Sequence, residues 1–229
     1  MAVVVGWAML PSPPPQRPIG LFTSLPIIWG EGDSLGDLLG KGRPPHRVHA
    51  ALATFGPVTP LDTLERLGPK LKRLVIAQPR PLTPAENVAL DNWVRGGGQL
   101  LLLADPLLTA SSVYPLGDPR RPQDVVLLSP ILTRWGLELT FDERQPAGVR
   151  SIAVKGPAVP VSLAGAWRTA SPACTVEGGG LLVTCRIGQG RAVALADAEV
   201  LAAEDPDATR APALTGLLQR AFRAGAGQS

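Results

Sequence analysis

The residues best suited to chemistry in this chain are acidic side chains that follow apolar runs. Asp105 and Asp197 each end a run with the character of a buried strand, and Glu31 lies in the Gly-rich loop after the first such run. Open α/β sheets bind ligands beyond the carboxyl ends of their strands, so we expect one ligand crevice there, including Ser24 at the end of the first run and Trp29 of the loop that follows it. The alternative is that Asp105 and Asp197 only cap the turns that follow them.

Two carboxylates that converge on one crevice are also the requirement for acid and base catalysis. A hydrolase that uses Glu31 and Asp105 in these roles would need both groups in one pocket with perturbed pKa values. This is the alternative to a binding function.

The two cysteines are spaced for a cross-strand pair. If Gly179 and Gly180 form a two-residue hairpin turn, counting outward places Cys174 opposite Cys185. Opposed residues of a non-hydrogen-bonded pair lie roughly 4.5–5.5 Å apart at Cα, a separation that a disulfide bridges. We predict a disulfide, with two buried thiols as the alternative. A disulfide would favour a periplasmic or membrane-associated location, and free thiols a cytoplasmic one.

Other motifs indicate no cofactor. The glycine pairs at 30–32 and 40–42 lack the Gly-Lys-Ser/Thr ending of a phosphate loop, and the pair at 188–190 fits a turn between strands. His46 and His49 lie in a Pro-rich approach to an expected strand, without a nearby acid or nucleophile pattern. No four-ligand set for a metal is present either, so we expect no cofactor, no metal and no catalytic residue.

The composition indicates a folded domain that does not bind nucleic acid. The chain has 229 residues, of which 45% are hydrophobic and 18% charged, with a formal net charge of +3. The charges are scattered, so we expect no nucleic-acid partner. Residues 2–10 are apolar but far shorter than the roughly 20 residues of a membrane-spanning helix, so no transmembrane segment is expected. We expect residues 1–17 to be a Pro-rich lead-in and 18–229 one domain.

Local patterns predict strands that alternate with helices. The apolar runs at 71–77 and 99–104 flank a helix that opens with the capping box of Thr83 and Glu86 and ends at three glycines. This strand–helix–strand unit implies a parallel sheet. Further helices are expected from Thr59, Ser129 and Pro212, and further strands at 19–25, 137–141 and 191–196. Short β-prone pieces between 149 and 176 suggest an antiparallel addition.

Several of these segments together resemble a known family. Residues 74–84, 93–98, 103–106 and 186–197 are similar to the class I glutamine-amidotransferase-like domain of gliding-motility-type ABC transporter auxiliary proteins, over about 18–222. The resemblance implies a three-layer α/β fold with a mostly parallel open sheet, flavodoxin-like or amidotransferase-like, and an antiparallel β addition in the C-terminal third.

The catalytic residues of that superfamily are missing. Its enzymes carry a nucleophilic cysteine on a sharp turn after a strand, activated by a later histidine and glutamate. Here the matching strand ends in Asp105, and both histidines precede it. We therefore expect a non-enzymatic binding or assembly module. The resemblance implies an ABC transporter membrane subunit or other envelope protein as partner. Pro26, Trp29 and neighbouring apolar residues of the first loop would form an exposed patch for docking, with ordinary core packing of Trp29 as the alternative.

Overall fold

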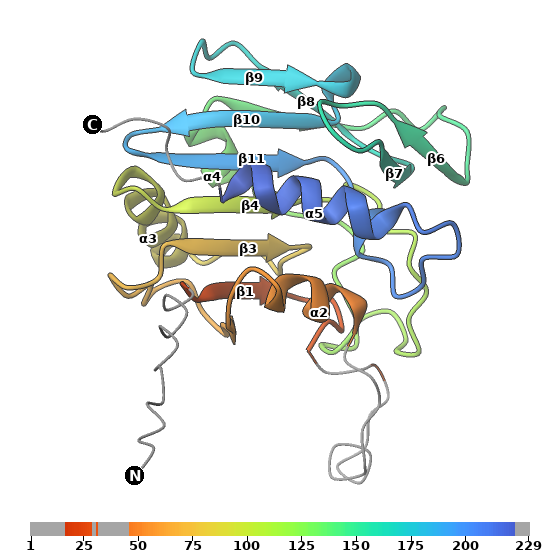
Figure 1. Ribbon diagram of the computed structural model, residues 1–229, viewed down its shortest axis with the longest axis horizontal. Coiled ribbons are helices and arrows are strands. Elements are labelled where there is room, and N and C mark those ends of the chain that lie inside the picture. The colour runs from red at the N-terminus through yellow and green to blue at the C-terminus, as the bar shows by residue number, and fades with distance from the viewer. Residues whose placement is uncertain (1–16, 29–30, 32–45, 223–229) are drawn as a thin grey trace, which may run out of the picture.

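A seven-stranded, mostly parallel sheet forms the centre of the α/β fold (Figure 1). The computed structural model describes residues 17–28, 31 and 46–222, so the expected lead-in lies outside the described residues apart from Arg17. The strands in spatial order are β2 (Val58–Pro60), β1 (Ile19–Thr23), β3 (Arg73–Ala77), β4 (Gln99–Leu103), β11 (Gly190–Leu195), β10 (Leu182–Ile187) and β9 (Cys174–Glu177). Pairing is parallel from β2 to β11 and antiparallel from β11 to β9.

The predicted strand–helix–strand unit is confirmed. Helix α3 (Pro84–Arg95) opens with the reciprocal capping box, in which the Thr83 hydroxyl accepts from the Glu86 N–H and the Glu86 carboxylate accepts from the Thr83 N–H. The helix returns the chain to the parallel β3–β4 pair. Its C-terminal end lies directly on the start of β11, where a Cβ on Gly190 would come within 1.9 Å of the Val94 carbonyl oxygen. Only glycine fits at that contact.

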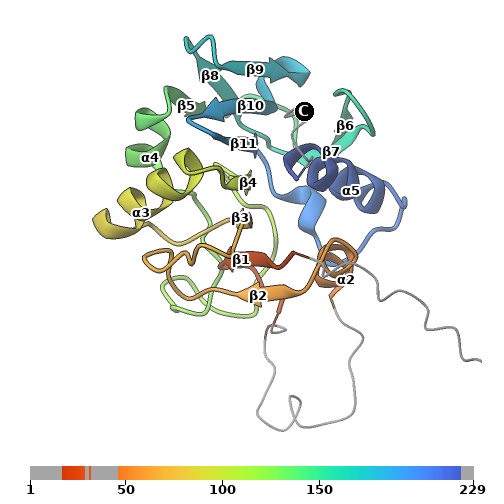
Figure 2. The same ribbon diagram turned by 60° about the vertical axis from the view of Figure 1, so that its left-hand side comes forward.

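Helices cover the two faces of this sheet (Figure 2). Helices α2 (Arg47–Ala53) and α5 (Arg210–Ala221) lie on one face, and α3 and α4 (Ser129–Arg134) on the other. Side chains of a strand alternate between the two faces of the sheet. Leu101 therefore packs into the hydrophobic cluster beneath α5, and Leu102 into the cluster beneath α3. The unbroken apolar run of β4 is explained by this burial on both sides.

Two local predictions are wrong. Residues from Thr59 do not begin a helix, because 58–60 pair with β1 as an edge strand, a position that tolerates Pro60. His46 does not approach a strand: its Nδ1 accepts a hydrogen bond from the Val48 N–H and caps α2. The sequences around Thr59 and His46 do not decide between helix and strand without the neighbouring strand and core.

The antiparallel addition is narrower than expected. Only β9 and β10 extend the main sheet. The other short strands form separate pairs, namely β6 (Val149–Ile152) with β7 (Val159–Ser162) and β5 (Leu137–Thr140) with β8 (Ala166–Thr169).

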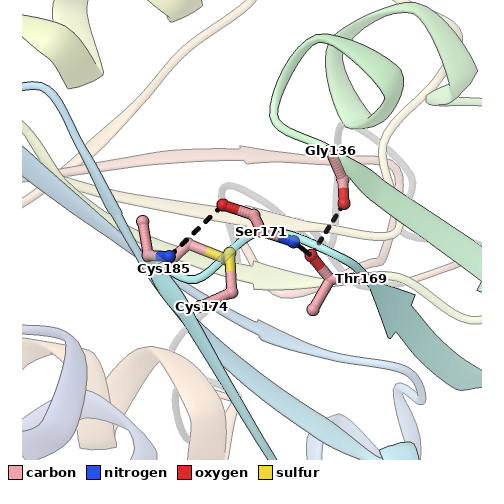
Figure 3. Close-up of a disulfide and its surroundings, with 6 residues drawn as sticks. Gly136, Thr169, Ser171, Cys174 and Cys185 are labelled. Atoms are coloured by element: carbon pink, nitrogen blue, oxygen red, sulfur yellow. Dashed lines mark hydrogen bonds between the residues drawn. A yellow bond between two sulfur atoms is a disulfide. The ribbon is translucent and has the colours of Figure 1, made fainter.

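The hairpin between β9 and β10 has the predicted register. Gly179 and Gly180 take positive φ angles of 66° and 107°, and the Leu181 N–H donates to the Gly178 carbonyl. Cys174 lies opposite Cys185 with a Cα separation of 4.1 Å, and the structure joins them by a disulfide (Figure 3). The Cys174 N–H also donates to the Ser171 carbonyl, and the Ser171 N–H to the Thr169 hydroxyl. The disulfide therefore fastens the edge strand to the sheet.

Candidate ligand-binding site

The carboxyl ends of β4 and β11 bring two buried carboxylates together. Asp105 follows β4 and Asp197 follows β11, and these strands are direct neighbours. One oxygen of Asp105 accepts from the Leu107 N–H and the other from the Ala198 N–H, the residue after Asp197. The same side chain thus holds its own turn and the turn of the adjacent strand.

Asp197 is bound in the same manner. Its two oxygens accept from the backbone N–H groups of Ser162 and Glu199, at 3.0 and 2.6 Å, and the side chain has no solvent exposure. Burial raises the pKa of Asp105 to about 6. Burial and then the charge of Asp105 raise the pKa of Asp197 to about 8. Desolvation outweighs the backbone hydrogen bonds, which favour the ionised form, so Asp197 retains a proton at neutral pH.

Gln78, directly after β3, orders the same strand ends. Its side-chain oxygen accepts from the Asp105 N–H, and its amide nitrogen donates to the carbonyls of Asp105 and Gln123. The residue is fully buried with φ at +42°, in the left-handed region that non-glycine residues rarely occupy. Three hydrogen bonds offset the cost of this backbone, and through them the residue holds the backbones of Asp105 and Gln123 in place.

A cavity of about 140 Å³ opens beside these strand ends. This volume is well above the roughly 10–15 Å³ needed for one water molecule. Its apolar wall includes Leu25, Ile27, Leu108 and Leu201, and polar groups at its surface come from Glu31, His46, Asp105 and Glu199. The cavity can therefore hold a small molecule with an apolar side and hydrogen-bond donors.

Glu31 and His46 have unused hydrogen-bonding capacity at this cavity. One oxygen of Glu31 accepts from the Val113 N–H at 2.8 Å, while the other is buried without a hydrogen-bond partner among the described residues. Burial, with the nearby charges of Arg47 and His49, lowers the pKa of His46, so its ring is neutral at pH 7. Since Nδ1 accepts from Val48, the proton belongs on Nε2, which is a donor.

Glu199 is already engaged. It forms an ion pair with Arg210, and the Arg210 side chain also donates to the Glu199 carbonyl. Arg47 donates to the Val200 and Ala202 carbonyls of the same segment. This wall of the cavity is held in place by two arginines from α2 and α5.

The structure places the predicted site residues differently. Glu31 and Asp105 share the cavity, whereas Asp197 is buried behind it. Ser24 does not line it: its hydroxyl donates to the Gln78 carbonyl and accepts from the Gln123 N–H, a structural role. Trp29 lies outside the described residues.

Gln78, His46 and Glu199 belong to the site or support it and were not predicted from sequence. Gln78 follows an apolar strand in the same position as Asp105, and that position was the available signal. His46 gave none, because its place at the cavity depends on α2 packing against α5.

In residues 17–28, 31 and 46–222, no cluster of three or more His, Cys, Asp or Glu side chains is arranged for a metal ion. No helix in that part of the chain is long and apolar enough to cross a membrane.

Comparison with known proteins gives structural neighbours only. No family profile and no curated protein matches the sequence. The mmIFT52 N-terminal domain superposes with a TM-score of 0.57 at 12% identity, over 92% of this chain and 99% of that domain. A ThuA-like protein from Bacteroides uniformis ATCC 8492 gives 0.50 at 11% identity, over 95% and 94%. The exo-β-1,4-mannosidase Op5Man5 from Opitutaceae bacterium strain TAV5 gives 0.52 at 15% identity, over 89% of this chain and 35% of the enzyme.

These likenesses show a shared α/β fold and no more. The chain spans about a third of the length of Op5Man5 and of the GH42 β-galactosidase Gan42B from G. stearothermophilus, which it matches with a TM-score of 0.52. Proteins with different names share the fold, so its function must be argued from the site.

Proposed function

We propose that this chain is a non-enzymatic binding module of amidotransferase-like, three-layer fold, and that the strand-end cavity is its ligand site. The observation that carries the proposal is the state of Asp105: both of its oxygens accept backbone N–H groups, so its carboxylate holds two turns together. A group fixed in this way favours a preformed binding surface over proton transfer.

The free polar groups favour a hydroxyl-rich ligand such as a sugar. The unpaired oxygen of Glu31 is an acceptor and Nε2 of His46 is a donor, beside an apolar wall. Sugar rings present hydroxyls at the edge and apolar C–H groups on the face. A peptide-like ligand, whose amine would bind Glu31, is the competing class.

The biological setting we propose is an ABC-type transport or envelope system, with a membrane subunit of that system as the partner. The ThuA-like neighbour supports the amidotransferase-like fold that this setting rests on. The disulfide supports residence in an oxidising compartment such as the periplasm.

The ligand test is a titration of the whole chain with galactose, mannose and glycylglycine by isothermal calorimetry. Saturable binding of a sugar that weakens about tenfold in Glu31→Gln, a loss of about 1.4 kcal/mol, supports the proposal. Glu143→Gln is the matched control, because Glu143 is exposed and does not line the cavity. Binding of glycylglycine alone reassigns the ligand class, and absence of binding by all three refutes the proposed site.

A carboxylate-dependent hydrolase is the second candidate. It is favoured by one observation: Glu31 and Asp105 line the same cavity, and burial raises the pKa of Asp105 to about 6, within the range of a general acid. Steady release of p-nitrophenol from p-nitrophenyl β-galactoside or β-mannoside, lost in both Glu31→Gln and Asp105→Asn, would establish it over the binding module.

A further inference from the structure

The main sheet ends at β9, and the outer side of this strand is open. β9 is the last strand in spatial order, and Figure 1 shows no further strand of the described chain beyond it. The neighbouring strand β8 lies close to β9 but pairs with β5 instead. Thr175 and Val176 in the middle of β9 are both exposed, the valine by 39%. An open edge of this kind presents backbone hydrogen-bonding groups to another chain.

The hydrogen bonds of the hairpin show which backbone groups point outward. The Arg186 N–H donates to the Ala173 carbonyl, so these two opposed residues form a hydrogen-bonded pair. Such pairs alternate with non-hydrogen-bonded pairs along antiparallel strands. Cys174 and Cys185 therefore form a non-hydrogen-bonded pair, in agreement with their short Cα separation of 4.1 Å, and Val176 is of the same type two positions further on. The N–H and carbonyl groups of Cys174 and Val176 thus point away from β10.

Most of these outward groups are not used within the fold. The Cys174 N–H donates to the Ser171 carbonyl. On the outer side, the Cys174 carbonyl and the N–H and carbonyl of Val176 form no hydrogen bond with any other residue that the structure describes. One donor and two acceptors are therefore free, on either side of Thr175.

β9 also lacks the features that keep edge strands apart. Natural edge strands avoid pairing with other chains by carrying lysine or proline. β2, at the other edge of the sheet, ends in Pro60, whereas β9 contains neither residue type. The one charged side chain of β9 is Glu177, and both of its oxygens accept from Arg220. The edge is therefore neither blocked nor repelled by an unpaired charge of its own.

We propose that β9 pairs antiparallel with β9 of a second copy of this chain, about a twofold axis through Thr175. In this register Val176 of each copy lies opposite Cys174 of the other, and its N–H donates to the Cys174 carbonyl. The two Thr175 side chains lie directly opposite each other, and cross-strand threonine pairs are favourable. The contact uses the same surface of both copies, so it closes at the dimer. It does not depend on the proposed function.

A second copy suits this edge better than a flexible peptide. The free groups of Cys174 and Val176 are arranged about Thr175, so the strand is complementary to itself. The Cys174–Cys185 disulfide already holds β9 in its extended form, and pairing therefore orders no further backbone, whereas a peptide would lose conformational entropy. Because Arg220 neutralises Glu177 in each copy, the two strands meet without repulsion between like charges.

The association should be weak and reversible. Stable interfaces bury roughly 1,200–2,000 Å² in total, and a pair of four-residue strands covers less. We therefore expect a dissociation constant of about 10–500 µM, which sedimentation equilibrium of the whole chain at about 5–500 µM measures. The chain should be monomeric at the lowest concentration and substantially dimeric at the highest.

A charge exchange at Thr175 tests the partner and the register together. Thr175→Lys and Thr175→Glu each place two like charges opposite each other at the axis, and each should raise the dissociation constant at least about fivefold. An equimolar mixture of the two variants should dimerise at least as well as wild type, because unlike charges then face each other. Thr59→Lys makes the same substitution at an exposed residue of the opposite edge strand and is the control.

The outcomes are distinct. A dimer that both Thr175 variants weaken, that their mixture restores and that Thr59→Lys leaves unchanged supports the proposal. A chain that stays monomeric at the highest concentration overturns it and leaves the edge to a segment of another protein. A dimer insensitive to Thr175→Lys, a mixture that fails to restore association, or oligomers that grow beyond the dimer also overturn it. Thermal unfolding of each variant verifies that it is folded.

Discussion

Replacing Asp197 by Asn should remove a pH dependence from the stability of the fold. The carboxyl is fully buried, and burial with the charge of Asp105 raises its pKa from an ordinary 3.8 to about 8. Between those values the folded state holds a proton that the unfolded state has lost. The free energy of unfolding must therefore fall as pH rises, until Asp197 is ionised in both states.

The magnitude follows from one-site linkage. With a folded pKa of about 8, protonation of Asp197 stabilises the fold by about 2 kcal/mol at pH 6.5 and by almost nothing at pH 9. Between pH 6.5 and 9, titration of His46 has little effect on the free energy of unfolding. Its lowered pKa makes the free energy of unfolding rise with pH, the opposite sign, and does so only below about pH 6.5. Asp105, with a pKa of about 6, is already mostly ionised at pH 6.5.

Urea unfolding followed by tryptophan fluorescence at pH 6.5, 7.5 and 9 measures this slope. We expect the free energy of unfolding to fall by about 2 kcal/mol in wild type and to stay level in Asp197→Asn. At pH 6.5 the variant should be the less stable, because an amide can accept from only one of Ser162 and Glu199. Asp207→Asn, at an exposed residue, is the control. Equal slopes in wild type and Asp197→Asn, or wild-type stability that rises with pH, would refute the reasoning.

Three other predictions concern stability. Gln78→Ala should lower the free energy of unfolding by about 2–4 kcal/mol, because three hydrogen bonds are lost. Gln78→Gly should lower it by about 1 kcal/mol less, because glycine tolerates φ at +42°. Equal losses for the two variants in urea unfolding would exclude backbone strain. Glu86→Gln should cost about 2 kcal/mol at pH 7. Hydrogen bonding to Arg80 lowers the pKa of Glu86 to about 2, so the deficit should shrink as pH falls from 4.5 towards 2, and a deficit constant with pH would count against it. Reduction of the Cys174–Cys185 disulfide should cost about 3 kcal/mol from loop closure over 11 residues, with no effect of reductant on the double alanine variant.

Much of the fold was predictable because its signals are local. The capping box at Thr83, the apolar run of β4 and the glycine pair at 179–180 each specify their element from neighbouring residues. The pairing of Cys174 with Cys185 then follows by counting along the hairpin. The Thr59 segment was mispredicted because Thr-Pro opens helices as readily as it fits an edge strand, and only pairing with β1 decides between them.

The site was only partly predictable because its geometry is long-range. That Glu31 and Asp105 meet at one cavity follows from the rule for parallel strand ends. The same rule does not show which side chains make their hydrogen bonds within the fold and are therefore not available to a ligand. Ser24 looked available for a ligand, but its hydroxyl binds the Gln78 carbonyl, 54 residues along the chain. Asp197 also follows a strand, yet backbone contacts from Ser162 draw it out of the cavity.

Saturation-transfer NMR of the whole chain with p-nitrophenyl β-galactoside or β-mannoside, followed over hours, tests the binding module most directly because one sample reports contact and turnover. We predict transfer to the sugar protons of at least one glycoside, diminished in Glu31→Gln and unchanged in Glu143→Gln, with the glycoside intact at the end. Accumulation of p-nitrophenol, or no transfer to either sugar, would contradict it.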